Sequence, residues 1–309
     1  MQDFSQRLQN TIARPVQVSG FGLFGGIDVT LEFCPADPDH GIVFERVDLN
    51  SSVRIPALIE YVVPKPRCTV IAHQEASVSV IEHVMAALAG LQIDNCLIRL
   101  NAPEPPGCDG SSLAFVESLL KAGIVSQDSP RKCFVVDQTL MVTEVENIGI
   151  GAQPPKTSEY EIGFILDYGD GPIGRQSFQT QITPELFERE LASCRTFVLE
   201  SEVKTLQANG IGKRATPQNV LVFSDQGLIE NSLRFPNECA RHKALDCLGD
   251  FALLGCRLAG RFIATQSGHR TNHAIIRKIR EQMIQSNAPA TIPLPTSCFT
   301  PPSQHRAAS

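Results

Sequence analysis

Residues 79–90 read Ser-Val-Ile-Glu-His-Val-Met-Ala-Ala-Leu-Ala-Gly, an apolar pattern that predicts a helix closed by Gly90. An apolar strand is predicted next, at Asn95–Leu100. A loop rich in Gly and Pro follows at 103–112, and it leads into a second predicted helix at 112–123. β-rich stretches precede this helix–strand–loop–helix unit, at 16–33 and 42–72.

The second half of the chain repeats this order. It predicts a helix at 238–254 with Gly255 at its end, a strand at 260–265, a loop at 266–271 and a helix at 272–285. β-rich stretches again come first, at 133–143 and 159–182. We therefore predict an α+β fold of two duplicated two-layer α/β sandwich domains, each with helices on one face of a largely antiparallel sheet. We expect the active site to lie between the two domains.

The domain boundaries follow from a short polar stretch, Ser-Gln-Asp-Ser-Pro-Arg at 126–131. We predict an N-terminal α+β domain at 1–126 and a C-terminal α+β domain at 132–286. The tail, 287–309, holds several prolines and few residues to bury, so we expect it to be disordered.

The composition of the 309 residues, 42% hydrophobic and 19% charged, is typical of a soluble globular protein. The net charge of −6 and the lack of a basic stripe argue against nucleic acid as a partner. The N-terminus lacks the order of a signal peptide, and no apolar run approaches the ~18 residues of a membrane span, so no transmembrane segment is expected. The ten cysteines show no Cys-x-x-Cys spacing, which favours reduced thiols and a cytoplasmic protein.

His242 and Asp246 are four residues apart in the helix predicted at 238–254, so their side chains share one helical face. An imidazole and a carboxylate in this arrangement supply two ligands of a three-ligand metal site that leaves a position open for water. Asp250 continues the face one turn later. The alternative is an ordinary ion pair on the protein surface.

Glu82 and His83 lie in the first predicted helix. His83 is a candidate third ligand if this helix faces the one that carries His242. Glu82 would then be placed to accept a proton from water at the metal, which is the position of a general base. The alternative is a Glu-His pair that faces solvent.

His269 lies in Ser-Gly-His-Arg-Thr, a small-residue stretch predicted as a loop that presents a side chain into a cleft. A protonated imidazole there is a candidate donor to a leaving amine, and Asp250 is a candidate to hold it charged. Lys243 and Thr196 are candidates to stabilise an oxyanion. The alternative for His269 is simple exposure, and Asp109 is interpreted as a cap of the helix at 112–123.

Several dispersed motifs, taken together and in order, resemble the UDP-3-O-acyl-N-acetylglucosamine deacetylase family, the zinc amidases that commit bacteria to lipid A synthesis. The resemblance covers nearly all of residues 6–285. It rests on Ser-Gly-Phe-Gly-Leu (19–23), Val-Ile-Glu-His-Val-Met-Ala-Ala-Leu-Ala-Gly-Leu-Gln-Ile-Asp-Asn (80–95), Asp-Gly-Ser-Ser (109–112), Cys-Arg-Thr-Phe (194–197), Leu-Arg-Phe (233–235), Arg-His-Lys-Ala-Leu-Asp-Cys-Leu-Gly-Asp (241–250) and Ser-Gly-His (267–269).

The resemblance implies a role for each candidate residue. His83, His242 and Asp246 would bind Zn²⁺, with Fe²⁺ as the alternative metal in the cell. Glu82 would be the general base, and His269, supported by Asp250, the cationic acid. Thr196 and Lys243 would stabilise the oxyanion, Phe197 would lie beside the substrate, and an insert at about 197–230 would form an acyl-chain passage. The implied substrate, UDP-3-O-acyl-N-acetylglucosamine, is amphiphilic, so transient contact with a membrane surface is expected.

Three departures from the family pattern concern nucleotide affinity and acyl-length preference. Phe24 stands where the family usually has a histidine, and Gln266 where it often has a lysine that contacts the nucleotide. Lys213-Arg214-Ala215 replaces a small Gly-Gly-Ser in the insert. These departures support one alternative, a non-catalytic nucleotide-lipid-binding homologue of the same fold. A second alternative, a non-haem Fe(II) site for oxygen chemistry, follows from the set of two histidines and one carboxylate.

Overall fold

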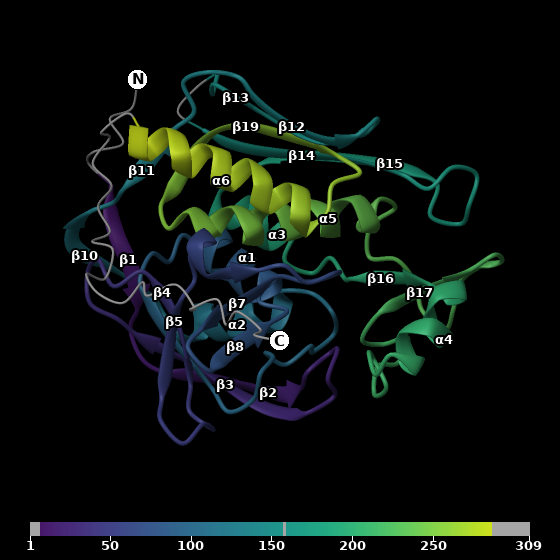
Figure 1. Ribbon diagram of the computed structural model, residues 1–309, viewed down its shortest axis with the longest axis horizontal. Helices are drawn as coiled ribbons and strands as arrows, with labels where there is room; N and C mark the ends of the chain where they lie inside the picture. The colour runs from purple at the N-terminus through teal and green to yellow at the C-terminus, as the bar shows by residue number, and fades with distance from the viewer. Residues whose placement is uncertain (1–6, 157–158, 286–309) are drawn as a thin grey trace, which may run out of the picture.

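The computed structural model describes residues 7–156 and 159–285, so the predicted tail at 287–309 lies outside the described residues. Figure 1 shows two sheets as the outer layers of the molecule, with the helices packed between them. This arrangement confirms the predicted α+β fold.

The first sheet has the strand order β2 (Val16–Phe21), β3 (Asp28–Pro35), β9 (Cys96–Leu100), β4 (Ile42–Arg46) and β5 (Val53–Pro56). β9 runs antiparallel to β3 and parallel to β4. Alternate residues of β3 (Val29, Leu31 and Phe33) are buried, as a sheet with one covered face requires. The same half contains α1 (Glu82–Gly90), which precedes β9 along the chain, and α2 (Leu113–Ala122), which follows it.

The second sheet repeats this topology strand for strand. Its order is β12 (Leu140–Val145), β13 (Ile148–Gln153), β19 (Arg257–Thr265), β14 (Tyr160–Asp167) and β15 (Arg175–Gln181), with β11 (Cys133–Val135) paired to the start of β19. β19 again runs antiparallel to one neighbour and parallel to the other. The matching helices are α5 (Glu238–Phe251), extended by a short 3-10 turn at Ala252–Leu254, and α6 (His269–Gln285). The duplication predicted from the order of elements is confirmed.

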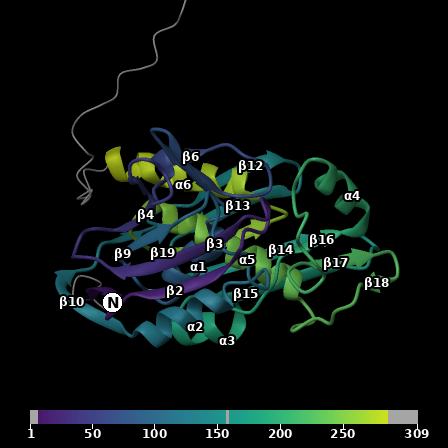
Figure 2. The same ribbon diagram turned by 90° about the horizontal axis from the view of Figure 1, so that it is seen from below.

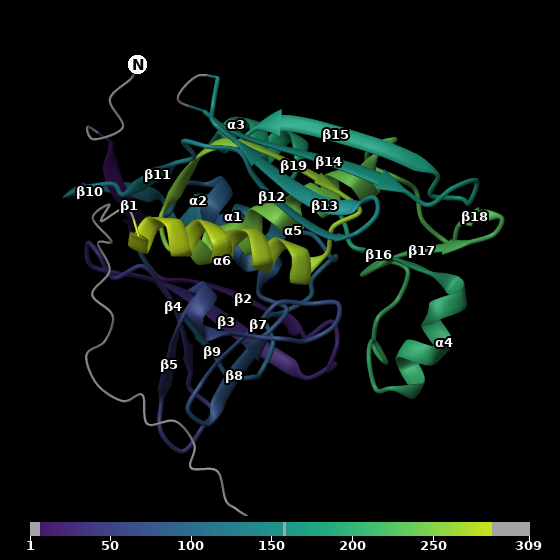
Figure 3. The ribbon, with the colours of Figure 1, turned by 45° about the horizontal axis from the view of Figure 1, so that its top comes forward.

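Each half contains an insert between its fifth strand and its first helix. The first insert, 57–81, holds a 3-10 turn (Ile59–Tyr61), β6 (Val62–Val63), β7 (Val70–His73) and β8 (Ala76–Ser79). The second insert, 182–237, holds α3 (Pro184–Glu190), β16 (Phe197–Leu199), α4 (Glu200–Ala208), β17 (Leu221–Ser224) and β18 (Gly227–Leu228). Its α4 and β16–β18 project from one side of the molecule (Figure 2 and Figure 3).

The polar stretch at 126–131 is not a simple connector. Most of it belongs to β10 (Ile124–Pro130), which pairs antiparallel with β1 (Leu8–Ile12). The Gln127 side chain accepts a hydrogen bond from Asn95 at 2.7 Å and donates one to the Ala36 carbonyl at 2.8 Å. This polar stretch forms a strand because it pairs with β1 and because the Gln127 side chain finds its partners at Asn95 and Ala36.

The helices α1 and α5 meet at the centre of the molecule, where they pack with backbone contact. A Cβ at Gly249 of α5 would lie 2.1 Å from the Glu82 carbonyl oxygen of α1. α1 begins at Glu82, later than predicted, because Ser79 ends β8 and Val80 has a φ of 58°, which is not helical. Gly90 is its last residue, and the missing side chain makes room for the Phe187 ring, which a Cβ would approach to 2.2 Å.

Candidate metal centre and active site

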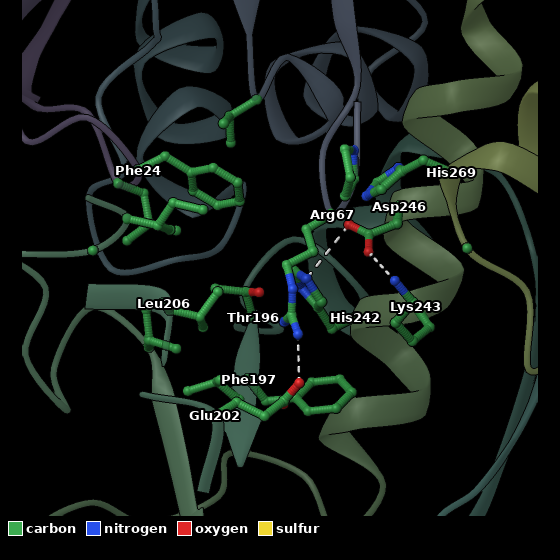
Figure 4. Close-up of a pocket in the computed structure, with 18 of the residues that line it drawn as sticks. Phe24, Arg67, Thr196, Phe197, Glu202, Leu206, His242, Lys243, Asp246 and His269 are labelled. Atoms are coloured by element: carbon green, nitrogen blue, oxygen red, sulfur yellow. Dashed lines mark hydrogen bonds and ion pairs between the residues drawn. The ribbon is translucent and has the colours of Figure 1, made fainter. Parts of the chain in front are cut away.

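Three buried side chains from α1 and α5 converge at this helix contact. His83 lies in the first turn of α1, and His242 and Asp246 lie one turn apart on α5. The Asp246 Oδ1 is 3.6 Å from His83 Nε2 and 3.4 Å from His242 Nε2. One ligand atom from each residue lies within 4.8 Å of the other two. Figure 4 shows His242 and Asp246 directed toward the same space.

The donor atoms fit a divalent metal ion. Asp246 Oδ1 is buried and has no hydrogen-bond partner among the described residues, while Oδ2 accepts from Lys243 Nζ at 2.6 Å. The His242 Nδ1 lies 3.1 Å from the Cys194 carbonyl, so it carries the proton and Nε2 keeps its lone pair. Two imidazole nitrogens and one carboxylate oxygen suit zinc or iron.

The charges of this group also suit metal binding. Burial lowers the pKa of His242 to about 4, so its imidazole is neutral at physiological pH. Burial alone would raise the pKa of Asp246, but His242 and Lys243 hold it well below the usual range for a carboxyl group. A neutral imidazole and an ionised carboxylate are the protonation states that bind metal.

Glu82 lies between this group and His269. Its Oε2 accepts a hydrogen bond from the Thr69 backbone N–H at 3.1 Å, and its Oε1 is 3.6 Å from His269 Nε2. Burial raises the pKa of Glu82, which makes the carboxylate a better proton acceptor.

His269 is the first residue of α6 rather than part of a loop. The helix starts there because the Asn272 N–H bonds to the Gly268 carbonyl at 3.0 Å. The His269 Nδ1 lies 2.7 Å from Asp250 Oδ2. Burial opposes the charged imidazole, but Asp250 and Glu82 together raise the pKa of His269 to about 9. The structure therefore brings the predicted imidazolium and its predicted carboxylate partner together.

Two further residues of this cluster, Thr69 and His273, were missed from the sequence. Thr69 Oγ1 lies 2.5 Å from Asp250 Oδ1 and 2.9 Å from His273 Nε2. The spacing His269-x-x-x-His273 could have indicated a second imidazole on the same helical face. No pattern pointed to Thr69, because it reaches the site from the first insert.

The remaining predicted residues line one cavity with the metal-ligand group. The Phe197 ring packs edge-on against His242, with ring centroids 6.3 Å apart, and Thr196 and Lys243 lie beside it (Figure 4). Gln266 reaches the wall, but its Nε2 donates to the Asp167 carbonyl at 2.7 Å and its Oε1 accepts from the Asp167 N–H at 3.2 Å.

The cavity has a volume of about 1000 Å³ and extends from the metal-ligand group into the second insert. Its far wall is apolar and is formed by Val203, Leu206, Ile211, Val220, Val222 and Ile229. Phe24 also lines it. An ion pair between Arg67 of the first insert and Glu202 of α4 spans the cavity (Figure 4).

Arg214, a departure from the family pattern, and Asp109, interpreted above as a helix cap, make contacts away from the metal-ligand group. Arg214 donates to the Gly26 carbonyl and to Asp28 Oδ1, both at 2.7 Å, and so links the second insert to the first half. Asp109 does not cap α2 directly. Its Oδ1 accepts from the Ser111 hydroxyl at 2.7 Å, and the Ser111 hydroxyl accepts from the Leu113 N–H at 3.1 Å.

Comparisons with known proteins identify relatives over most of this chain. A family described as UDP-3-O-acyl N-acetylglycosamine deacetylase matches residues 9–281. The chain is 38% identical over 272 residues to the UDP-3-O-acyl-N-acetylglucosamine deacetylase of Anaeromyxobacter sp. (strain Fw109-5), with 88% of each chain covered. It is 36% identical over 273 residues to the protein of the same name from Brucella melitensis biotype 2, which covers 88% of this chain and 94% of the relative. Among the described residues, no helix is long and apolar enough to cross a membrane.

Proposed function

The chain belongs to the UDP-3-O-acyl-N-acetylglucosamine deacetylase family, and we propose that the buried groups around its cavity carry out the family's reaction. The protein is a hydrolase of lipid A biosynthesis that cleaves the acetamide of UDP-3-O-acyl-N-acetylglucosamine to UDP-3-O-acyl-glucosamine and acetate. The observation that carries the proposal is the convergence of the metal-ligand group with the buried side chains of Glu82 and His269 in one cavity.

His83, His242 and Asp246 would hold the metal ion, which we propose to be Zn²⁺ with Fe²⁺ as the alternative. When bound, such an ion supplies Lewis acidity to a carbonyl oxygen and to water. The unpartnered Asp246 Oδ1 supports this assignment, because a buried carboxylate oxygen without a donor is costly unless a cation binds it.

Glu82 and His269 would move the protons. Glu82 accepts a proton from the water that adds to the acetamide carbon. The C–N bond then breaks, and His269 donates its Nε2 proton to the glucosamine nitrogen. The Nδ1 of His269 is bonded to Asp250, which leaves Nε2 facing Glu82 and the cavity.

Lys243 and Thr196 would stabilise the oxyanion that forms on the acetamide oxygen. Although burial opposes its charge, Asp246 raises the pKa of Lys243 above its usual range, so the ammonium group keeps its charge beside the ligands. Phe197 and Gln266 would contact the substrate. The apolar wall formed by the predicted acyl-passage segment at about 197–230, which lies within the second insert, would receive the acyl chain.

Release of free amine from UDP-3-O-acyl-N-acetylglucosamine tests this proposal on wild type and on Glu82→Gln. We expect turnover that a zinc chelator abolishes, that added Zn²⁺ restores, and that the variant loses while keeping its metal. The matched control is Glu202→Gln, a neutralised carboxylate of the same cavity that touches no ligand. Amine release at the wild-type rate by metal-loaded Glu82→Gln would remove Glu82 from the mechanism. No release by the metal-loaded wild type would favour the non-catalytic alternative.

A cytoplasmic location, transient contact with a membrane surface and the lack of a nucleic-acid partner stay predictions from the composition and from the amphiphilic substrate. Sedimentation of the protein with vesicles of anionic lipid tests the membrane contact.

A further inference from the structure

Asp250 is the hub of a buried hydrogen-bond network, and its side chain has no exposed surface. Its Oδ2 accepts from His269 Nδ1 and from Asn272 Nδ2, each at 2.7 Å. Its Oδ1 lies 2.5 Å from the Thr69 hydroxyl. Although burial raises it, the pKa of Asp250 is held below its usual range by His269 and His273, so the carboxylate is ionised and only accepts.

The Thr69 hydroxyl fixes the direction of the next hydrogen bond. It has a single proton, and Asp250 Oδ1 is its closest acceptor. His269 Nδ1 is 3.2 Å from the same hydroxyl, but its proton goes to Asp250 Oδ2 at the shorter distance. The His273 Nε2, at 2.9 Å, must therefore carry a proton and donate it to Thr69.

His273 lies one turn after His269 on α6 and is buried, with 6% of its surface exposed. Its Nε2 is also 3.5 Å from Asp250 Oδ1. The charged groups that face the His269 imidazole are Asp250 and Asp246 of α5 and Glu82 of α1. Donors that engage Asp250 reduce the negative charge that this carboxylate offers to His269.

We propose that His273 is a positioning residue for the deacetylation: it acts through the Thr69 hydroxyl to orient Asp250 and to limit how strongly Asp250 holds the proton on His269. The inference rests on the proposed role of His269 as the proton donor. An acid that is held too tightly donates slowly, so the network sets the acidity of His269 and not only its place.

The test compares His273→Leu, which removes the donor, with His273→Gln, which keeps an N–H group at a similar reach. The His269 pKa is measured by NMR in the zinc-loaded protein, and kcat/KM is measured against pH in parallel. In His273→Leu we expect the His269 pKa and the basic limb of the profile to rise by about one unit, and kcat at neutral pH to fall roughly tenfold. His273→Gln is expected to restore both.

Thr69→Val provides a second route if His273→Leu does not fold. It removes the relay, so we expect it to raise the His269 pKa as well. Adding His273→Leu or His273→Gln to Thr69→Val is then expected to change the His269 pKa little further, because the effects of residues in one network are not additive.

An unchanged His269 pKa in both His273→Leu and Thr69→Val would overturn the inference while the deacetylase activity stands. An equal loss of kcat at every pH, with no movement of the basic limb, would overturn it too by reducing His273 to a structural role. A His269 pKa that rises without any change in the activity profile would instead overturn the donor role of His269, on which the inference rests. The NMR measurement separates these cases because it needs no turnover.

Discussion

The two inserts occupy the same point of the duplicated topology, but the first contributes hydrogen-bonding groups to the site and the second contributes an apolar wall. The first insert, between β5 and α1, supplies Thr69, whose N–H and hydroxyl bond to Glu82 and Asp250. The second insert, between β15 and α5, supplies an apolar wall that includes Val203 and Leu206. We infer that the first insert serves proton transfer, and that the second insert, apart from its Thr196, serves recognition of the acyl chain.

Each half of the chain contributes part of the metal-ligand group and part of the proposed proton-transfer residues. The first half contributes His83 and Glu82 from the start of α1. The second half contributes His242, Asp246 and Asp250 from α5 and His269 from α6. Neither half holds a complete site, although the two halves share one topology.

The largest effect is expected at Glu82 and His269, the residues from the two halves that we propose to move the protons. Glu82→Gln and His269→Gln should each lower kcat by about 10²–10⁴-fold, the usual range for a positioned base or acid. The double variant should be little slower than the worse single variant, because the two residues act on one reaction. Metal content and thermal unfolding are the controls. A mild loss in one variant alone would remove that residue from proton transfer.

The pH dependence of the reaction should identify the contribution of His269. The raised pKa of His269 predicts that kcat/KM falls tenfold per pH unit above about pH 9, where the imidazolium loses its proton. The stability that the ion pair with Asp250 contributes is fully present below the ordinary value of 6.5 and is lost as the pH rises through about 9. Unfolding by urea at pH 7 and pH 10 measures this loss. A basic limb that persists in His269→Gln would assign the limb to another group.

Acyl-chain selectivity should depend mainly on the apolar wall of the second insert. Leu206→Ala removes apolar contact worth up to ~1.5 kcal/mol, so kcat/KM for a long-chain substrate should fall roughly tenfold. A short-chain analogue should be cleaved almost as before. Thr69→Val is the matched control from the first insert, and it should slow both substrates by the same factor. Equal losses with both substrates in Leu206→Ala would contradict the division of labour between the inserts.

The smallest effect is expected where the inserts touch each other. The Arg67–Glu202 ion pair is about half exposed, so Glu202→Gln should change the free energy of unfolding by no more than ~1 kcal/mol. KM should change a few-fold, and its dependence on salt should weaken. A double-mutant cycle with Arg67→Gln measures the pair. A coupling well above that range would mean that the pair holds the second insert in place.

The sequence was most informative where a regular spacing of residues or elements reports on both the fold and the site. The spacing of His242, Asp246 and Asp250 predicted a common face, and the structure places all three on the buried side of α5. The order of elements predicted the duplication, because each half must bury a helix pair against its own sheet. Neither prediction required knowledge of contacts between distant residues.

Other features depended on distant contacts and could not be predicted in this way. Polar residues such as Gln127 form a strand because partners from the first half satisfy them. Thr69 joins the site from an insert with no periodic signal. The small residues before His269 predict a loop that includes it, whereas α6 begins at His269 itself.

Gly249 has a consequence for inheritance rather than for chemistry. A side chain at this position would meet the α1 backbone at Glu82 and push apart the two helices that share the metal ligands. A substitution there would change no ligand and no cavity wall, yet a genetic screen would score it as a metal-binding defect. The separation of α1 and α5, on which the proposed metal site depends, is thus set by a residue that has no functional group.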